Sequence, residues 1–300
     1  MLFETLGNPD HPAILFFHAM GVTGRSSEPV ARYLADDYFC IMPTATAYCA
    51  GQHYLSKADE VEQVERFLEE QGICHLELVV GSSLGADLAV AFLAHGKISV
   101  DHVFFDGGQF AQICRRTRRL MCPFPYLAMK SLYWSKGGTL KHILWCDNEA
   151  IKLYFIEAGE ALTYRNLCRM MGDSLEDRPF PKLPEELQRH AFWEFGSIED
   201  HFKYRDAVMK AWPEGHFPIF EGYNHMQYQI EDSKGFASML RSIMVRNEMP
   251  ELPSCEARCS RIHDCRATLA RSWQISMSAA YAWRIPAVST CPKSRSASSR

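Results

Sequence analysis

Leu76-Glu77-Leu78-Val79-Val80-Gly81-Ser82-Ser83-Leu84-Gly85-Ala86-Asp87-Leu88-Ala89-Val90, continuing to Gly96, is the stretch that decides how the rest of the chain is interpreted. Its first five residues are mostly apolar and partly β-branched, which indicates a buried strand. Residues 81–85 match the pattern G-x-S-x-G, and an apolar helical segment follows them. The stretch therefore predicts a strand, a sharp turn and a helix, with Ser83 at the centre of the turn.

The two glycines of this turn have a steric role. A serine held on a sharp turn from strand to helix adopts an unusual backbone conformation, and side chains two residues before or after it would collide with the chain. Gly81 and Gly85 occupy those two positions. Ser83 would then stand exposed at a helix N-terminus, where free N–H groups and the helix dipole favour a developing negative charge.

The overall composition restricts the classes of protein to consider. The chain has 300 residues, of which 47% are hydrophobic and 23% are charged, with a formal net charge of -4. These values fit one large soluble domain and give no reason to expect nucleic acid or an anionic membrane as partner. No run of 18 apolar residues occurs, and the N-terminal segment lacks the basic region of a secretory signal. We expect a cytoplasmic protein without a membrane span, whose oligomeric state the sequence does not indicate.

The eleven cysteines are scattered along the chain and form no C-x-x-C pair. Because no secretory signal is expected, we expect these cysteines to be reduced and most of them to be buried. The composition changes after Met249, where the sequence becomes rich in Ser, Arg and Ala and ends in KSRSASSR. We interpret residues 249–300 as a disordered or non-native tail. The tail contains four residues of the types that bind zinc: Cys255, Cys259, His263 and Cys265. Their spacing fits none of the usual zinc-ligand pairs, so a zinc site in the tail is disfavoured.

Outside the tail, apolar runs alternate with helical patterns. The alternation predicts a parallel α/β sheet with its functional residues at the carboxyl ends of the strands. Besides the strand before Ser83, strands are expected at 13–17, 38–43, 100–105, 190–195 and 217–221, and helices at 26–34, 57–71, 201–211 and 233–245.

Residues 109–185 interrupt this alternation. They contain an arginine cluster at 115–119, helical patterns at 150–158 and 162–171, and many large apolar and aromatic residues. We interpret this segment as a helical cap whose inner face forms an apolar substrate pocket. The core domain would then comprise residues 1–108 and 186–248.

Polar residues follow the ends of several predicted strands. Asp106 ends one strand, Glu199 and Asp200 follow another, and His225 follows the last. The turn at 18–21 follows the first strand and can supply a backbone N–H donor. Because the carboxyl ends of parallel strands lie at one edge of a sheet, we expect these groups to gather near the central serine. A serine nucleophile needs a base, a carboxylate that orients the base, and N–H donors for an oxyanion, and all are available there.

In these features the chain resembles the α/β-hydrolase family. The resemblance spans about residues 10–246 and implies a mostly parallel, doubly wound sheet with a helical cap insertion. The order of serine, acid and histidine along the chain is the order used by that fold. Four motifs carry the resemblance: GSSLG at 81–85, HAMG at 18–21, GSIE at 196–199 and GYNH at 222–225.

The resemblance assigns a role to each matching position. Ser83 would be the nucleophile, His225 the general acid and base, and Glu199 the carboxylate that orients His225. The backbone N–H groups of Met20 and Leu84 would form the oxyanion hole.

Two points depart from the family pattern or stay open. Ala19 stands where the family commonly has glycine, and a tight turn can tolerate that change. Asp200 and Asp106 are alternatives to Glu199, because Asp200 is its neighbour and Asp106 ends the earlier strand where some members carry the acid.

These assignments imply a serine hydrolase that acts on a carboxylic ester or thioester through an acyl-enzyme on Ser83. The alternatives are an acyltransferase or a C–C bond hydrolase or lyase with the same residues, and a non-catalytic binding protein of the same fold. The expected partner is a small-molecule acyl substrate. No metal or dissociable cofactor is expected, because no ligand cluster or phosphate loop is visible in the sequence.

Overall fold

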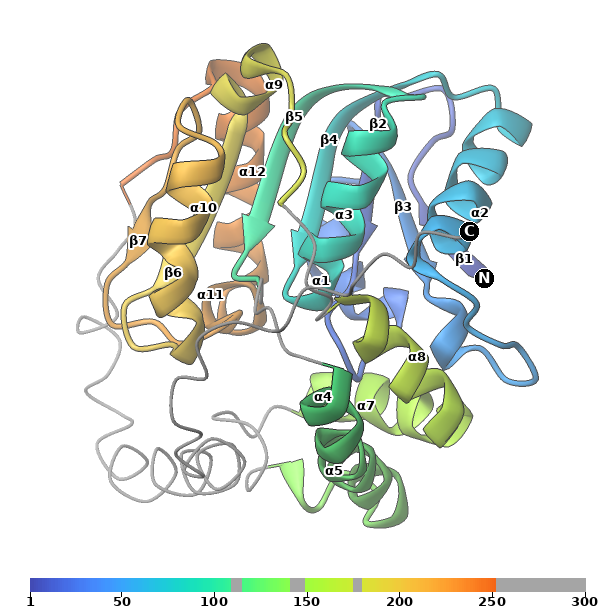
Figure 1. The fold of residues 1–300 in the computed structure, drawn as a ribbon. Coiled ribbons are helices and arrows are strands. Elements are labelled where there is room, and N and C mark those ends of the chain that lie inside the picture. The colour runs from blue at the N-terminus through green and yellow to red at the C-terminus, as the bar shows by residue number, and fades with distance from the viewer. Residues whose placement is uncertain (109–114, 141–148, 175–179, 252–300) are drawn as a thin grey trace, which may run out of the picture.

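A computed structural model describes residues 1–108, 115–140, 149–174 and 180–251. A seven-stranded sheet lies at its centre, in the order β1-β3-β2-β4-β5-β6-β7 (Figure 1). Strand β1 is antiparallel to β3, and the other neighbouring pairs are parallel. The sheet therefore confirms the predicted mostly parallel architecture. The strands are β1 (Leu2–Leu6), β2 (Ala13–Phe17), β3 (Phe39–Thr44), β4 (His75–Ser82), β5 (Ser99–Asp106), β6 (Ala191–Gly196) and β7 (Ile219–Phe220).

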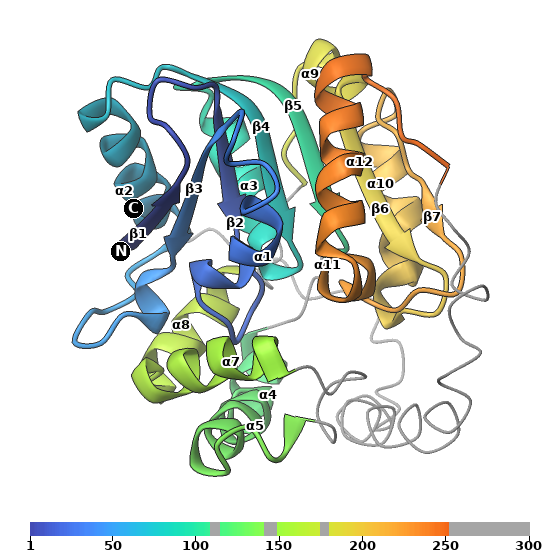
Figure 2. The same ribbon diagram turned by 180° about the vertical axis from the view of Figure 1, so that it is seen from behind.

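Helices cover both faces of this sheet. Helices α2 (Lys57–Glu70), α3 (Leu84–His95) and α10 (Arg205–Ala211) lie in front of the sheet in Figure 1. Helices α1 (Glu28–Ala31) and α12 (Ser233–Arg246) lie on the opposite face, which Figure 2 shows from the front. This arrangement is the doubly wound form that alternating strands and helices favour.

The two hydrophobic cores follow from the alternation of side chains along buried strands. On β2, Leu15 and Phe17 face the core beneath α2 and α3. Their neighbours Ile14 and Phe16 face the core beneath α1 and α12. Because every residue of β2 is buried, its sequence is a continuous apolar run, as expected of a central parallel strand.

Four further helices lie together beyond the carboxyl ends of the strands (Figures 1 and 2). They belong to the segment interpreted as a cap, whose exact limits remain a prediction. Residues 109–114, 141–148 and 175–179 of this segment lie outside the described residues. The four helices are α4 (Arg115–Met121), α5 (Pro123–Trp134), α7 (Glu149–Ala161) and α8 (Tyr164–Ser174).

Helix α8 is attached to the core by a buried amide. Asn166 is fully buried, and its Oδ1 accepts a hydrogen bond of 3.3 Å from the backbone N–H of Tyr54. Its Nδ2 donates to the carbonyl oxygens of Gln52 at 3.1 Å and Ala47 at 3.5 Å. Three backbone groups of the loop after β3 therefore depend on one side chain of α8.

Some elements differ from the sequence prediction. Strand β1, which pairs with β3 along the sheet edge, was not predicted, and neither was α11 (Gln227–Glu231). The helix expected at 201–211 consists of a 3-10 segment, η3 (Asp200–Tyr204), followed by α10. The short elements α9 (Glu185–Arg189), η1 (Gly24–Ser27) and η2 (Thr46–Tyr48) complete the described helices.

The remaining expectations concern cysteines, the tail and the membrane. Cys40, Cys49 and Cys122 are buried, and none of them forms a disulfide within the described residues, as expected for cysteines that serve as small apolar residues. Residues 252–300, which include nearly all of the tail, lie outside the described residues. Among the helices of the described segments, none has the length and apolar character needed to span a membrane.

Candidate active site

Ser83 occupies the strained turn that the sequence predicts. Strand β4 ends at Ser82 and α3 begins at Leu84, and between them Ser83 has φ 53° and ψ -114°. A non-glycine residue with positive φ is uncommon and persists only where its surroundings enforce it. The Ser83 N–H donates a hydrogen bond of 2.9 Å to the carbonyl oxygen of Asp106 at the end of β5. The turn is thus fixed against the neighbouring strand.

Gly81 and Gly85 are required by close backbone contacts. A β-carbon on Gly81 would lie 2.7 Å from Cα of Ala86, in the first turn of α3. A β-carbon on Gly85 would overlap the carbonyl oxygen of Phe17 at the end of β2. Gly85 therefore lets the N-terminus of α3 approach the residues that follow β2, which places the turn at 18–21 beside Leu84.

His18 stabilises that turn. Its Nδ1 lies 2.8 Å from the carbonyl oxygen of Ala19, and its Nε2 accepts a hydrogen bond of 3.0 Å from the N–H of Ala45. The acceptor role of Nε2 assigns the proton to Nδ1, so the imidazole is neutral. Burial, only partly opposed by the bond to Ala19, lowers the pKa of His18 to about 4. His18 is therefore a structural residue that holds this turn.

The two predicted oxyanion-hole residues have available N–H groups. Within the described part of the chain, neither the Met20 N–H nor the Leu84 N–H donates a hydrogen bond. The next N–H along, that of Gly21, donates to Tyr48 Oη at 2.8 Å, which holds the turn in place. Leu84 is the first residue of α3, so its N–H also benefits from the helix dipole.

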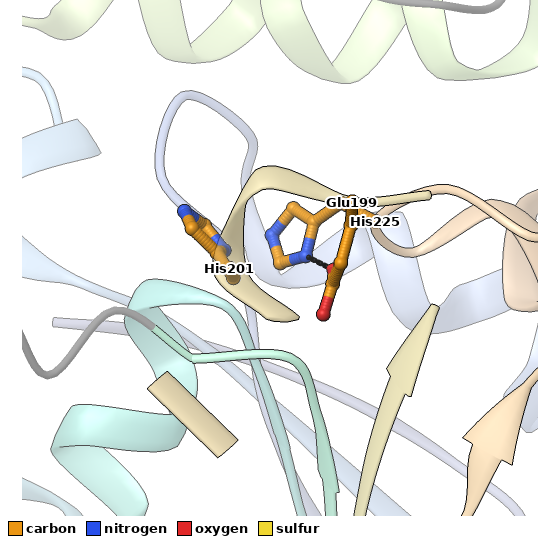
Figure 3. A group of neighbouring side chains, drawn as sticks. All are labelled: Glu199, His201 and His225. Atoms are coloured by element: carbon orange, nitrogen blue, oxygen red, sulfur yellow. Dashed lines mark hydrogen bonds and ion pairs between the residues drawn. The ribbon is translucent and has the colours of Figure 1, made fainter. Parts of the chain in front are cut away.

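His225 and Glu199 form a close pair. His225 Nδ1 lies 2.6 Å from Glu199 Oε2 (Figure 3). The side chain of Glu199 is 1% exposed and that of His225 is 22% exposed, so the carboxylate is buried behind an imidazole that reaches the site. Burial alone lowers the pKa of His225, but the hydrogen bond and charge of Glu199, with the charges of Asp106 and Asp200, raise it above its ordinary value.

The other two candidate acids occupy different environments. Asp200 is exposed at the start of η3, directly after Glu199. Asp106 is 1% exposed, and its Oδ2 accepts a hydrogen bond of 2.7 Å from Gln229 Nε2. Of the three acids left open by the sequence, Glu199 is the one hydrogen-bonded to His225.

Asp106 belongs to a buried pair of carboxyl groups. Glu194 lies directly opposite Asp106 in the register of β5 and β6, and the two carboxyl groups influence each other's pKa. Burial raises the pKa of both groups, and the charge of Asp106 raises that of Glu194 still further. The raised pKa of Glu194 favours its protonated form beside Asp106. Gln229 connects this pair to the serine turn, because its Nε2 also lies 3.2 Å from Ser82 Oγ.

Gly107 brings His225 close to the serine turn. A β-carbon on Gly107, which has φ 64°, would overlap the imidazole of His225. The preceding residue, Asp106, accepts the backbone hydrogen bond of Ser83. The end of β5 is therefore packed against His225 and hydrogen-bonded to the serine turn.

Helices beyond the strand ends contact one side of this site, at the turn at 18–21 and at Leu84. Met129 of α5 and Phe155 of α7 lie where a side chain on Gly21 would need space, so both helices reach the turn at 18–21. Met20 and Leu84 pack against an apolar cluster drawn mainly from α5, α7, α8 and the loop after β3. A cleft beside Leu84 and His18 has an apolar wall formed in part by α8.

Sequence reasoning missed several residues of this region. Glu194 sits within an apolar strand and Gln229 in a short helix, and neither carries a motif. His201, on η3, lies against His225 with ring centroids 4.4 Å apart. Burial and the charge of His225 depress the pKa of His201 well below its ordinary value. Its position two residues after Glu199 was the one available indication.

Comparisons with known proteins identify the fold. No protein-family model and no curated protein sequence matches the chain. A structure assigned to the alpha/beta hydrolase family, from Desulfitobacterium hafniense, has 17% identity and a TM-score of 0.64 over 81% of this chain and 100% of that chain. An esterase from Exiguobacterium antarcticum has 12% identity and a TM-score of 0.60 over 81% and 94%. The epoxide hydrolase CorEH has 13% identity and a TM-score of 0.61 over 82% and 95%.

These neighbours carry different activities, so the likeness establishes the fold and leaves the reaction to be argued from the site. The chain has the α/β-hydrolase fold.

Proposed function

We propose that this chain is a serine hydrolase that cleaves a carboxylic ester or thioester through an acyl-enzyme on Ser83. The observation that carries the proposal is the 2.6 Å hydrogen bond between Glu199 and His225, with His225 packed against the strand end that binds the Ser83 turn. A buried carboxylate that accepts a bond from Nδ1–H leaves Nε2 as the basic nitrogen.

In the proposed mechanism, Ser83 Oγ attacks the substrate carbonyl carbon as His225 Nε2 removes its proton. The negative charge on the carbonyl oxygen is stabilised by the N–H groups of Met20 and Leu84. His225 then protonates the leaving alcohol or thiol, and the acyl group remains on Ser83. Water activated by His225 attacks the acyl-enzyme, releases the acid and restores the serine.

We further propose that residues 109–185 act as a cap that selects the substrate. The apolar character of the cluster around Met20 and Leu84 favours an uncharged or weakly polar small-molecule acyl group. The proposal includes a cytoplasmic location and no bound cofactor. The competing possibility of acyl transfer is tested by analysis of products in the presence of an alcohol acceptor.

Fluorophosphonate labelling with peptide mapping tests the activated serine. The wild type should be labelled on Ser83, and Ser83→Ala and His225→Ala should both abolish the label. Ser82→Ala is the matched control, because it removes the adjacent hydroxyl, whose neighbour is Gln229, and should retain the label. Turnover of nitrophenyl esters of increasing chain length then measures the size of the acyl pocket.

A folded wild-type protein that is not labelled and does not turn over any of these esters would contradict the proposal. In that case a binding protein with the same fold becomes the better interpretation. Circular dichroism of each variant verifies that loss of labelling does not come from loss of structure.

A further inference from the structure

His201 has no role in the proposed reaction, yet its ring lies against that of His225. It belongs to η3, two residues after Glu199, and its ring meets that of His225 edge to face at 80° (Figure 3). Its Nδ1 is buried and has no hydrogen-bond partner among the described residues. Burying a nitrogen without a hydrogen-bond partner costs free energy, and a bound ion or ligand at this position would remove that cost.

Glu199 presents a second atom of this kind. Its Oε2 bonds to His225, while its Oε1 is buried and has no hydrogen-bond partner in the described segments. The donor atoms that Glu199, His201 and His225 can offer all lie within 4.8 Å of one another. Two imidazoles and one carboxylate whose donor atoms lie this close together form a donor set typical of zinc.

The distances are close to those of an assembled site. Zinc binds imidazole nitrogen at about 2.0 Å and carboxylate oxygen at about 2.0–2.2 Å, so tetrahedral ligands lie roughly 3.3 Å apart. A separation of up to 4.8 Å therefore requires a contraction of at most about 1.5 Å when the ion binds. The charge of Asp106 acts on His225 and so adds negative potential at one of the three proposed ligands.

We propose that Glu199, His201 and His225 bind a divalent transition metal ion of the zinc class, and that the bound ion inhibits the enzyme. Three protein ligands leave a fourth coordination position open for water. The binding part of the proposal depends only on these three residues. The inhibitory part rests on the proposed hydrolase function, because it concerns the base of that reaction.

Inhibition follows from either way of binding His225. An ion on Nε2 occupies the lone pair that would accept the serine proton. An ion on Nδ1 displaces the proton through which His225 is held by Glu199. In both cases His225 can no longer act as a correctly oriented base.

A second cluster of similar composition provides an internal control. His75, Glu77 and Asp101 also place donor atoms within 4.8 Å, but His75 and Asp101 are exposed, at the start of β4 and in β5. His75 Nε2 already lies 3.1 Å from Asp101 Oδ2. This cluster is remote from the serine turn along both strands, so an ion bound there should not affect Ser83.

Isothermal titration of the full chain with zinc chloride tests the binding. His201→Phe keeps an aromatic ring against His225 but has no nitrogen to bind a metal. His201→Gln keeps a polar side chain at the same position. The two variants are used together so that misfolding of one does not prevent the test. We expect both to weaken zinc binding at least about tenfold, whereas His75→Gln leaves the site that controls Ser83 unchanged. Equal zinc affinity and stoichiometry in the wild type and both His201 variants would overturn the proposal.

Ser83 labelling rate and ester turnover give the second readout, each taken relative to the same variant without metal. Micromolar zinc should suppress both in the wild type and in His75→Gln, a chelator should restore them, and the His201 variants should need at least about tenfold more zinc. Inhibition that is identical in the His201 variants overturns the inhibitory role. If no variant labels or turns over without zinc, the hydrolase proposal fails, while the titration still decides whether the metal site exists.

Discussion

The backbone N–H of Ser83 is hydrogen-bonded to the carbonyl oxygen of Asp106 at 2.9 Å, and the residue after Asp106 packs directly against His225. The end of β5 is therefore a common support for the serine turn and for the histidine. Asp106 and Gly107 can therefore affect the reaction without contacting the substrate. A shift of either residue would change the separation between the proposed nucleophile and its base.

Glu199→Gln tests the orienting carboxylate. The variant should lower kcat/KM by about 10²- to 10⁴-fold, because an amide does not hold the imidazole in the required state. Glu199 is also the main contributor that raises the pKa of His225 against the effect of burial. The wild type should therefore lose activity on acidification with a midpoint above the ordinary histidine pKa, and the residual activity of the variant should have a lower midpoint.

The matched control is Asp200→Asn, since it removes an exposed acid adjacent to Glu199. It should change kcat/KM by less than about threefold, the effect expected of a charge screened by solvent. A larger loss in Asp200→Asn than in Glu199→Gln would show that the acid has been assigned to the wrong residue.

Gly85→Ala tests the close approach of α3 to β2. The added methyl group would overlap the carbonyl oxygen of Phe17, and backbone atoms cannot move aside as a flexible side chain can. We expect a loss of about 1–3 kcal/mol in the free energy of unfolding, with a large loss of Ser83 labelling. Gly172→Ala is the control, because a β-carbon there meets no atom within 4 Å and should stabilise α8 by about 0.5–1 kcal/mol. Urea unfolding of both variants measures the difference.

Glu194→Gln tests the buried carboxyl pair. Because the pKa of Glu194 is raised by folding, the folded protein keeps a proton that the unfolded chain releases. Wild-type stability should therefore fall as pH rises from the ordinary acid range toward the folded pKa, by about 1.4 kcal/mol for each unit of the shift. The amide cannot titrate, so the variant should lose less stability between pH 5 and pH 8. Parallel stability curves for the two proteins would refute the raised pKa, and Glu62→Gln controls for loss of an exposed acid.

Asn166→Ala tests the attachment of α8. The change leaves three backbone groups of the loop after β3 without their side-chain partner, so we expect a loss of about 1–3 kcal/mol of stability. Amide hydrogen exchange should accelerate in the peptide that contains Tyr54. Arg165→Ala, on the exposed side of the same helix, should leave both measurements nearly unchanged. Unaltered exchange at Tyr54 would mean that the loop is held by other contacts.

Much of the fold could be predicted because local patterns and global structure agree. The run at 13–17, the turn around Ser83 and the glycines at 81 and 85 each have one physical interpretation, and the structure adopts it. Strand β1 was missed because its burial is only partial, so LFETL lacks the continuous apolar character of the central strands. The short β7 was predicted to be longer because its apolar run exceeds the part that pairs with β6.

The site could be predicted only where residues follow strands. Ser83, Glu199 and His225 each lie in the turn that follows a predicted strand, so the topology of a parallel sheet brings them to one edge. Which acid bonds to His225 depends on side-chain direction, and that is decided by tertiary packing. Pairing of Glu194 with Asp106 depends on the register of β5 and β6, which no local pattern specifies.

The sheet order has a kinetic consequence. The proposed working groups lie on or beside β2, β4, β5, β6 and the segment after β7, so they are separated by up to about two hundred positions in the chain. Such long-range strand pairing is slow compared with the formation of helices. During refolding, recovery of Ser83 reactivity should lag behind recovery of helical circular dichroism, which makes the reactive serine a probe of the last docking events of the sheet.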